Sequence, residues 1–173
     1  MNFNKINKNL VLVGMMGSGK THLGMNLAKK LGYNFYDTDV LVEKYTKLKI
    51  SKIFENFGEK YFRDIEEKIT LDILKKKNSV ISLGGGGYLN STIRKITKKN
   101  CFSVWLKWDS KTLIERVKRN KNRPVIIKMN SFEIKKLIEQ RSKIYSQTDV
   151  KIYCEGKIKK NIINKIIKLY EKI

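Results

Sequence analysis

A glycine-rich segment near the start of the chain has the residue types and spacing needed to bind a nucleoside triphosphate. Residues 14–21 read Gly-Met-Met-Gly-Ser-Gly-Lys-Thr and fit the pattern GxxxxGK[ST]. The glycines let backbone N–H groups turn inward around a phosphate chain, and the helix predicted to follow adds the positive end of its dipole. Lys20 can then reach the β- and γ-phosphates, and the Thr21 hydroxyl can bind Mg²⁺. We therefore predict that ATP is bound by Gly17, Ser18, Gly19, Lys20 and Thr21.

Two acidic residues, Asp37 and Asp39, stand two positions apart where a second strand is predicted to end. Ligands in doubly wound sheets bind at the carboxyl ends of the strands, and we expect this strand to lie beside the first one. One carboxylate could then hold a hydrated Mg²⁺ while the other accepts a hydrogen bond from an attacking hydroxyl. The alternative is that Asp39 only caps the next helix, which is a common use of Asp.

A second glycine run, residues 82–87 with the sequence Ser-Leu-Gly-Gly-Gly-Gly, follows another apolar segment. Many P-loop proteins carry an acidic metal ligand at this place, and here there is none. Position 89 is not glycine, so the dinucleotide-binding pattern GxGxxG is also absent. Glycines let a ligand approach the backbone closely. The run indicates a substrate-facing loop, and a flexible turn is the alternative.

The elements that must position these residues alternate between short apolar strands and amphipathic helices. This alternation predicts an α/β fold with a central parallel sheet of about five strands and helices on both faces. The predicted strands are 9–13, 33–37, 79–83, 101–106 and 150–154, and the predicted helices are 20–31, 39–47, 50–57, 59–77, 90–98, 110–119, 131–145 and 157–173.

The length of 173 residues and the absence of internal repeats predict a single domain covering residues 1–173. A polar, basic stretch at residues 120–130 contains the only proline, Pro124.

The net charge of +22 could indicate a nucleic-acid partner, because Lys and Arg supply phosphate contacts. The charge comes from 32 lysines and only six arginines, and the lysines are spread over nearly every predicted helix. This distribution favours compositional bias over a nucleic-acid surface. No apolar run is long enough to span a membrane, no secretion signal is evident, and there are two cysteines, so we expect a cytoplasmic protein.

The motifs together resemble those of the shikimate kinase family. They are GMMGSGKT, then DTD seventeen residues after the lysine, then IFENFGEKYFRDIE, SLGGG, and finally RP followed by RxxxY. Their order and spacing extend from position 9 to about position 150. The resemblance implies a P-loop kinase fold and transfer of the γ-phosphate of ATP to the 3-hydroxyl of shikimate.

The resemblance also implies a role for particular residues. Asp37 would lie near the Mg²⁺ through water, and Asp39 would orient the attacking hydroxyl. A mobile lid at about residues 118–130 would contain Arg123, which would reach the transferred phosphate. Arg116 would stack on adenine. The shikimate site would contain Asp39, Arg63, Gly84, Gly85, Gly86 and Arg141.

Glu66 stands one helical turn after Arg63 and would orient it. His22 stands where the family often has a second Ser or Thr, and we include it among the ATP-binding candidates. It could instead only pack beside the start of the helix.

Alternatives remain open at this point. Another small-molecule P-loop kinase, such as one acting on gluconate, would share the glycine loop but does not account for Arg63, the glycine run and Arg141 together. A nucleoside monophosphate kinase lacks support because its lid and base-recognition motifs are not evident. A basic nucleic-acid-binding ATPase would account for the charge. For the shikimate kinase reading we expect a monomer, with no nucleic-acid or membrane partner.

Overall fold

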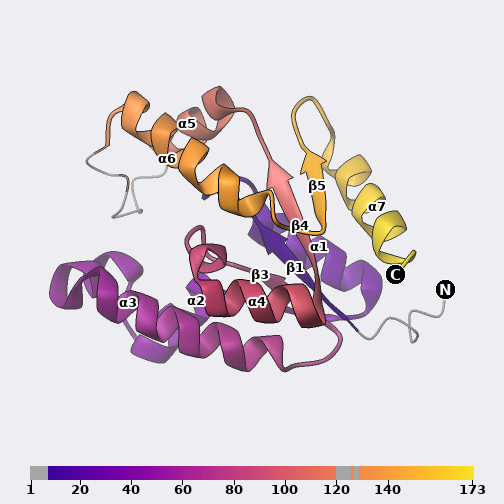
Figure 1. Ribbon diagram of the computed structural model, residues 1–173, viewed down its shortest axis with the longest axis horizontal. Helices are drawn as coiled ribbons and strands as arrows, with labels where there is room; N and C mark the ends of the chain where they lie inside the picture. The colour runs from indigo at the N-terminus through magenta and orange to yellow at the C-terminus, as the bar shows by residue number, and fades with distance from the viewer. Residues whose placement is uncertain (1–7, 120–125, 127–128) are drawn as a thin grey trace.

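The computed structural model describes residues 8–119, 126 and 129–173 (Figure 1). Its centre is a five-stranded sheet in the order β2-β3-β1-β4-β5, and every pair of neighbouring strands is parallel. The predicted parallel α/β sheet is therefore confirmed. The strands are β1 (Asn9–Val13), β2 (Asn34–Asp37), β3 (Ser79–Ser82), β4 (Cys101–Lys107) and β5 (Val150–Tyr153).

The expectation that the second strand lies beside the first is wrong, because β3 lies between them. The composition of the strands accounts for this order. β1 and β3 are buried at every position, whereas β2 is exposed or half-buried throughout. A strand with the polar sequence Asn-Phe-Tyr-Asp fits the edge of a sheet better than a place between two covered strands.

Helices cover both faces of the sheet (Figure 1). Leu10 and Leu12 of β1 pack with α1 and α7, while Val11 and Val13 pack on the opposite face with parts of α3, α4, α5 and α6. This split follows from the alternation of side chains along a strand. The helices are α1 (Lys20–Leu31), α2 (Thr38–Thr46), α3 (Ile50–Leu74), α4 (Ser91–Asn100), α5 (Ser110–Arg119), α6 (Ser131–Tyr145) and α7 (Lys159–Tyr170), with a 3₁₀ turn, η2 (Gly87–Leu89).

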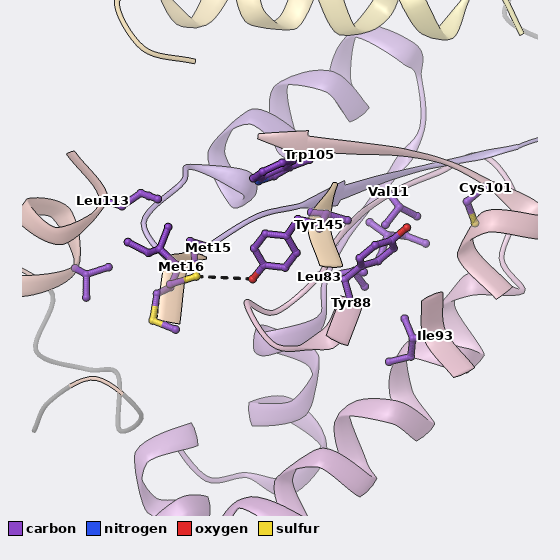
Figure 2. Close-up of a cluster of buried hydrophobic side chains, with 14 of the residues drawn as sticks. Val11, Met15, Met16, Leu83, Tyr88, Ile93, Cys101, Trp105, Leu113 and Tyr145 are labelled. Carbon is purple, nitrogen blue, oxygen red and sulfur yellow. Dashed lines mark hydrogen bonds between the residues drawn. The ribbon is translucent and has the colours of Figure 1, made fainter. Parts of the chain in front are cut away.

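Aromatic side chains fill the core between the sheet and α6. Trp105 of β4 packs against Tyr145 of α6, with ring centroids 5.9 Å apart. Figure 2 shows Tyr145 between Trp105 and Met15, with its hydroxyl directed to the Met15 sulfur. This core lies directly beneath the glycine loop, so it gives that loop a rigid base.

The break predicted between helices 50–57 and 59–77 is confirmed, because the backbone at Gly58 is not helical, with φ of +78°. The two helical segments follow each other directly as the two parts of α3. α3 ends at Leu74, three residues earlier than predicted, and the 3₁₀ turn η2 was not predicted. Of the predicted lid, residues 120–125, 127 and 128 lie outside the described residues. Within the described ranges, no helix combines the length and apolar character needed to cross a membrane.

Candidate active site

The glycine loop connects β1 to α1 at the carboxyl edge of the sheet. Gly17 and Gly19 have φ values of +78° and +86°, which only glycine adopts readily, and Gly19 is the residue before the first turn of α1. Lys20 is buried, and its Nζ donates hydrogen bonds to the carbonyl oxygens of Gly14 (2.8 Å) and Met15 (3.0 Å). The ammonium group is thus held across the loop.

Asp37 is the residue that caps α2, so the alternative reading of Asp39 as the N-cap is wrong. One oxygen of Asp37 accepts hydrogen bonds from the backbone N–H groups of Asp39 (3.1 Å) and Val40 (3.5 Å). Its other oxygen accepts the Thr21 hydroxyl at 2.6 Å. Capping therefore holds the Asp37 carboxylate beside Thr21. The side chain of Asp39, in the first turn of α2, does not serve as the cap.

The Thr21–Asp37 pair meets the needs of a Mg²⁺ ion bound together with a phosphate. Mg²⁺ keeps several of its waters and usually takes only one or two protein oxygens. No cluster of three or more His, Cys, Asp or Glu residues occurs among the residues described, so a cage built only from the protein is not found there.

Arg63 in α3 holds together two carboxylates. Its Nη1 donates to Glu66 at 2.6 Å, while Nε and Nη2 donate to one oxygen of Glu59 at 3.1 and 2.9 Å. Glu66 is buried, with 3% of its side chain exposed, and burial raises its pKa while the charge of Arg63 opposes the rise. The nearby Asp39 carboxylate raises the pKa of Glu66 further. The predicted pairing of Glu66 with Arg63 is confirmed by this hydrogen bond.

The second glycine run lies against these charged groups. A Cβ added at Gly84 would come within 2.6 Å of a Glu66 carboxylate oxygen, and one added at Gly86 would come within 2.6 Å of the Arg63 Cζ. The Gly84 N–H donates to the Thr38 hydroxyl at 2.8 Å. All four glycines are buried, so the run is a packed loop that faces the site, and the alternative of a flexible turn is wrong.

Arg141 reaches the same loop from α6. Its side chain is buried, and Nη1 donates to the Gly85 carbonyl at 3.3 Å, an oxygen that also accepts the Tyr145 hydroxyl. Burial raises the pKa of Tyr145 to about 12, so its hydroxyl stays protonated and can keep donating. Arg141 Nε and Glu66 Oε1 are buried and have no hydrogen-bond partner among the described residues. A buried polar atom without a hydrogen bond costs stability unless a ligand supplies the missing bond.

A cavity lies between these elements and the glycine loop. Two acids and two arginines line it, together with apolar side chains of α3. The polar set suits a small ligand that carries both a carboxylate and hydroxyl groups, and the apolar set suits a hydrocarbon ring. The lining residues are Met16, Asp39, Ile50, Phe54, Phe62, Arg63, Glu66, Gly85, Gly86 and Arg141.

The structure thus brings together Asp39, Arg63, the glycine run and Arg141, which were predicted from distant parts of the sequence. Arg116 lies at the other side of the glycine loop, where its Nη1 donates to the Gly17 carbonyl at 3.3 Å. His22 is exposed in the first turn of α1. Arg123 lies outside the described residues.

Sequence reasoning missed three residues at the site. Glu59 belongs to the GEKYFR segment, so its spacing of four from Arg63 could have indicated an ion pair along the helix. Thr38 stands inside the DTD motif and received no role. Trp108, whose indole N–H donates to the Ser18 carbonyl at 3.0 Å, has no signal in the sequence because its contact spans 90 positions.

Comparison with known proteins points to one family. The family model described as shikimate kinase matches residues 16–171. A shikimate kinase from Thermodesulfovibrio yellowstonii is 42% identical over 167 residues, which cover 96% of each chain. The solved shikimate kinase from Acinetobacter baumannii in complex with shikimate is 29% identical, with a TM-score of 0.92 over 98% of this chain and 96% of that one. A gluconokinase from Sinorhizobium meliloti, at 18% identity and a TM-score of 0.66 over 96% of this chain and 95% of that one, shares the fold alone.

Proposed function

The chain belongs to the shikimate kinase family, and we propose that it transfers the γ-phosphate of ATP to the 3-hydroxyl of shikimate, giving shikimate 3-phosphate. One observation supports this most strongly. A cavity that contains two arginines and Asp39 opens beside the glycine loop, so a carboxylate-bearing alcohol and a triphosphate can meet there.

In this proposal Arg63 and Arg141 bind the substrate carboxylate. The planar guanidinium groups match a carboxylate through paired hydrogen bonds. Arg141 has a buried Nε that lacks a hydrogen-bond partner among the described residues, and a carboxylate would satisfy it. Gly85 and Gly86 lie close to the two arginines, so a side chain there would displace the guanidinium groups that bind the substrate.

Asp39 accepts a hydrogen bond from the attacking hydroxyl and aligns it with the γ-phosphate. Phosphoryl transfer depends mainly on positioning and on stabilising charge on the equatorial oxygens. Lys20 supplies positive charge from the loop, and Arg123 would add to it from the lid. Thr21 would hold Mg²⁺ directly and Asp37 through water, and the ion supplies further charge neutralisation when it is bound.

The same proposal covers the partners of the chain. ATP and shikimate are the ligands, the protein acts as a monomer, and it works in the cytoplasm. The gluconate alternative has weaker support, because it gives no reason for two arginines at one cavity. A nucleic-acid partner has weaker support as well, because the lysines that carry the charge are spread over nearly every helix instead of being gathered on one face.

ADP release from Mg·ATP tests the proposal directly. Purified protein should turn over ATP with shikimate and not with gluconate or a panel of nucleoside monophosphates. Lys20→Ala should abolish turnover because the phosphate chain loses its charged anchor. Lys29→Ala, an exposed lysine in the last turn of the same helix, is the matched control and should turn over normally. Turnover with gluconate alone, or normal turnover by Lys20→Ala, would contradict the proposal.

A further inference from the structure

Arg116 and Trp108 form a stacked pair beside the glycine loop. Trp108 follows β4, and Arg116 projects from α5 so that its Cζ lies 3.7 Å from the centroid of the indole ring. The other cation–aromatic contacts within the described part of the chain span 5.0–5.9 Å. At 3.7 Å the guanidinium plane lies in contact with the face of the ring.

Both members of the pair are bonded to the loop. The indole N–H of Trp108 donates to the Ser18 carbonyl at 3.0 Å, and Arg116 Nη1 donates to the Gly17 carbonyl at 3.3 Å. A Cβ added at Gly17 would lie 3.3 Å from the Arg116 Cβ, so the turn and the base of the arginine are in close contact. The orientation of the guanidinium is therefore fixed by its ring contact and its hydrogen bond together.

The pair lies on the side of the loop away from the acceptor cavity. That cavity uses Met16 on the loop and Gly85 on the neighbouring strand end, whereas Arg116 meets the loop from the β4–α5 side. A triphosphate whose γ-phosphate points to the acceptor must leave the loop in the opposite direction. Its nucleoside then passes Arg116.

We propose that Trp108 is a positioning residue that holds the Arg116 guanidinium as a flat platform for the purine base of the nucleotide. This inference rests on the proposed kinase function. The indole covers one face of the guanidinium, and the purine stacks on the other. A planar group that is already ordered loses less side-chain freedom when the base binds. Stacking does not read the edge of the base, so the platform favours purines over smaller pyrimidines and distinguishes adenine from guanine poorly.

The deciding experiment compares ligands with and without a base. Affinities for Mg·ATP and for inorganic triphosphate with Mg²⁺ are measured by calorimetry on the wild type, Trp108→Leu and Trp108→Phe. Trp108→Leu should weaken ATP binding by up to about tenfold, because the free Arg116 side chain must then be ordered when the base binds. It should leave triphosphate within about twofold of the wild type, since no base is involved. Trp108→Phe keeps an aromatic ring face against Arg116 and should lose less affinity for ATP.

Equal weakening of both ligands would overturn the proposal, because Trp108 would then only support the loop through Ser18. Unchanged ATP affinity would overturn it too. In steady state the KM for ATP should rise while the KM for shikimate does not. The binding comparison needs no phosphate acceptor, so it stands even if shikimate proves not to be the substrate.

A fluorescence measurement covers the case in which Trp108→Leu does not fold. The chain has two tryptophans, so Trp105→Phe leaves Trp108 as the only indole. Mg·ATP should change the Trp108 emission, and inorganic triphosphate should change it much less. The same change with both ligands would refute stacking of a base on the platform.

Discussion

Replacing Arg63 with alanine tests the proposed carboxylate site. In the structure this guanidinium lies 2.6 Å from Glu66 and 2.9 Å from Glu59, at the wall of the acceptor cavity. A hydrogen bond to a charged group contributes about 1.5–3 kcal/mol, so losing two of them to the substrate carboxylate costs at least about 3 kcal/mol. The KM for shikimate should therefore rise by a factor of at least about a hundred, on the scale of tenfold for each 1.4 kcal/mol. The KM for ATP should change by less than about twofold, because the nucleotide does not contact this wall.

The same substitution leaves a buried acid without its cation, and this effect must be separated from substrate binding. Glu66 is only 3% exposed, so in Arg63→Ala its protonated form is favoured more strongly and the protein loses stability. The double variant Arg63→Ala/Glu66→Gln removes that acid and should recover stability without recovering the KM for shikimate. Arg94→Ala is a matched control, since Arg94 bonds only backbone carbonyls of η2, at 3.0 and 2.9 Å, outside the cavity.

Steady-state kinetics with each substrate varied at saturating levels of the other, combined with urea melts, measures both effects. An equal rise in the two KM values would remove Arg63 from the carboxylate site. Recovery of the KM for shikimate in the double variant would show that the defect came from the unpaired acid instead. Either result would refute the carboxylate-binding role of Arg63.

Three further predictions follow from the packing around the site and the core. Gly86→Ala places a Cβ within 2.6 Å of the Arg63 Cζ and should raise the KM for shikimate by at least about tenfold in the same kinetic assay, while Gly87→Ala, whose Cβ would meet Glu66 only at 3.5 Å, an ordinary van der Waals distance, should not. Burial raises the pKa of the Cys101 thiol to about 12 and that of Cys154 to about 11, so neither should react with a thiol reagent at about pH 8 until denaturant is added. Burial also raises the pKa of Glu66 above its ordinary 4.5, so the folded protein holds the carboxyl proton more tightly than the unfolded chain does. The stability that this proton contributes is complete below pH 4.5 and is lost as the pH rises through the raised pKa. Urea melts of Glu66→Gln should lack that decline of stability with pH.

The order of the sheet shows where sequence reasoning reached its limit. The strands and most helices were predicted to within a few residues because each has its own periodicity of apolar residues. The place of β2 was predicted wrongly, since pairing depends on which strands are buried on both faces. The burial of β2 must be compared with that of β3 to decide which strand lies next to β1. A pattern within one segment does not give that comparison.

Sequence reasoning anticipated the residues around the cavity better than those on the other side of the glycine loop. Asp39, Arg63 and Arg141 stand in motifs, so their meeting at one cavity could be expected from their types and spacing. Trp108 stands in no motif, and its contact with Ser18 forms only because β4 lies next to β1. Residues of this kind act through the backbone of another element, and the sequence does not mark them.

The positive charges of the chain include two contrasting groups, the many lysines and the two arginines that line the cavity. The net charge of +22 comes mostly from lysines on the surface, where salt at physiological strength screens interactions beyond about 8 Å. Arg141 is buried and Arg63 is held between two carboxylates, so their positions are fixed before a ligand arrives. A carboxylate that reaches them meets preorganised donors, and a contact with the buried Arg141 counts for more than one on the surface. Removing surface lysines should therefore alter the rate of encounter and its dependence on salt, whereas removing either arginine should alter which substrate is accepted.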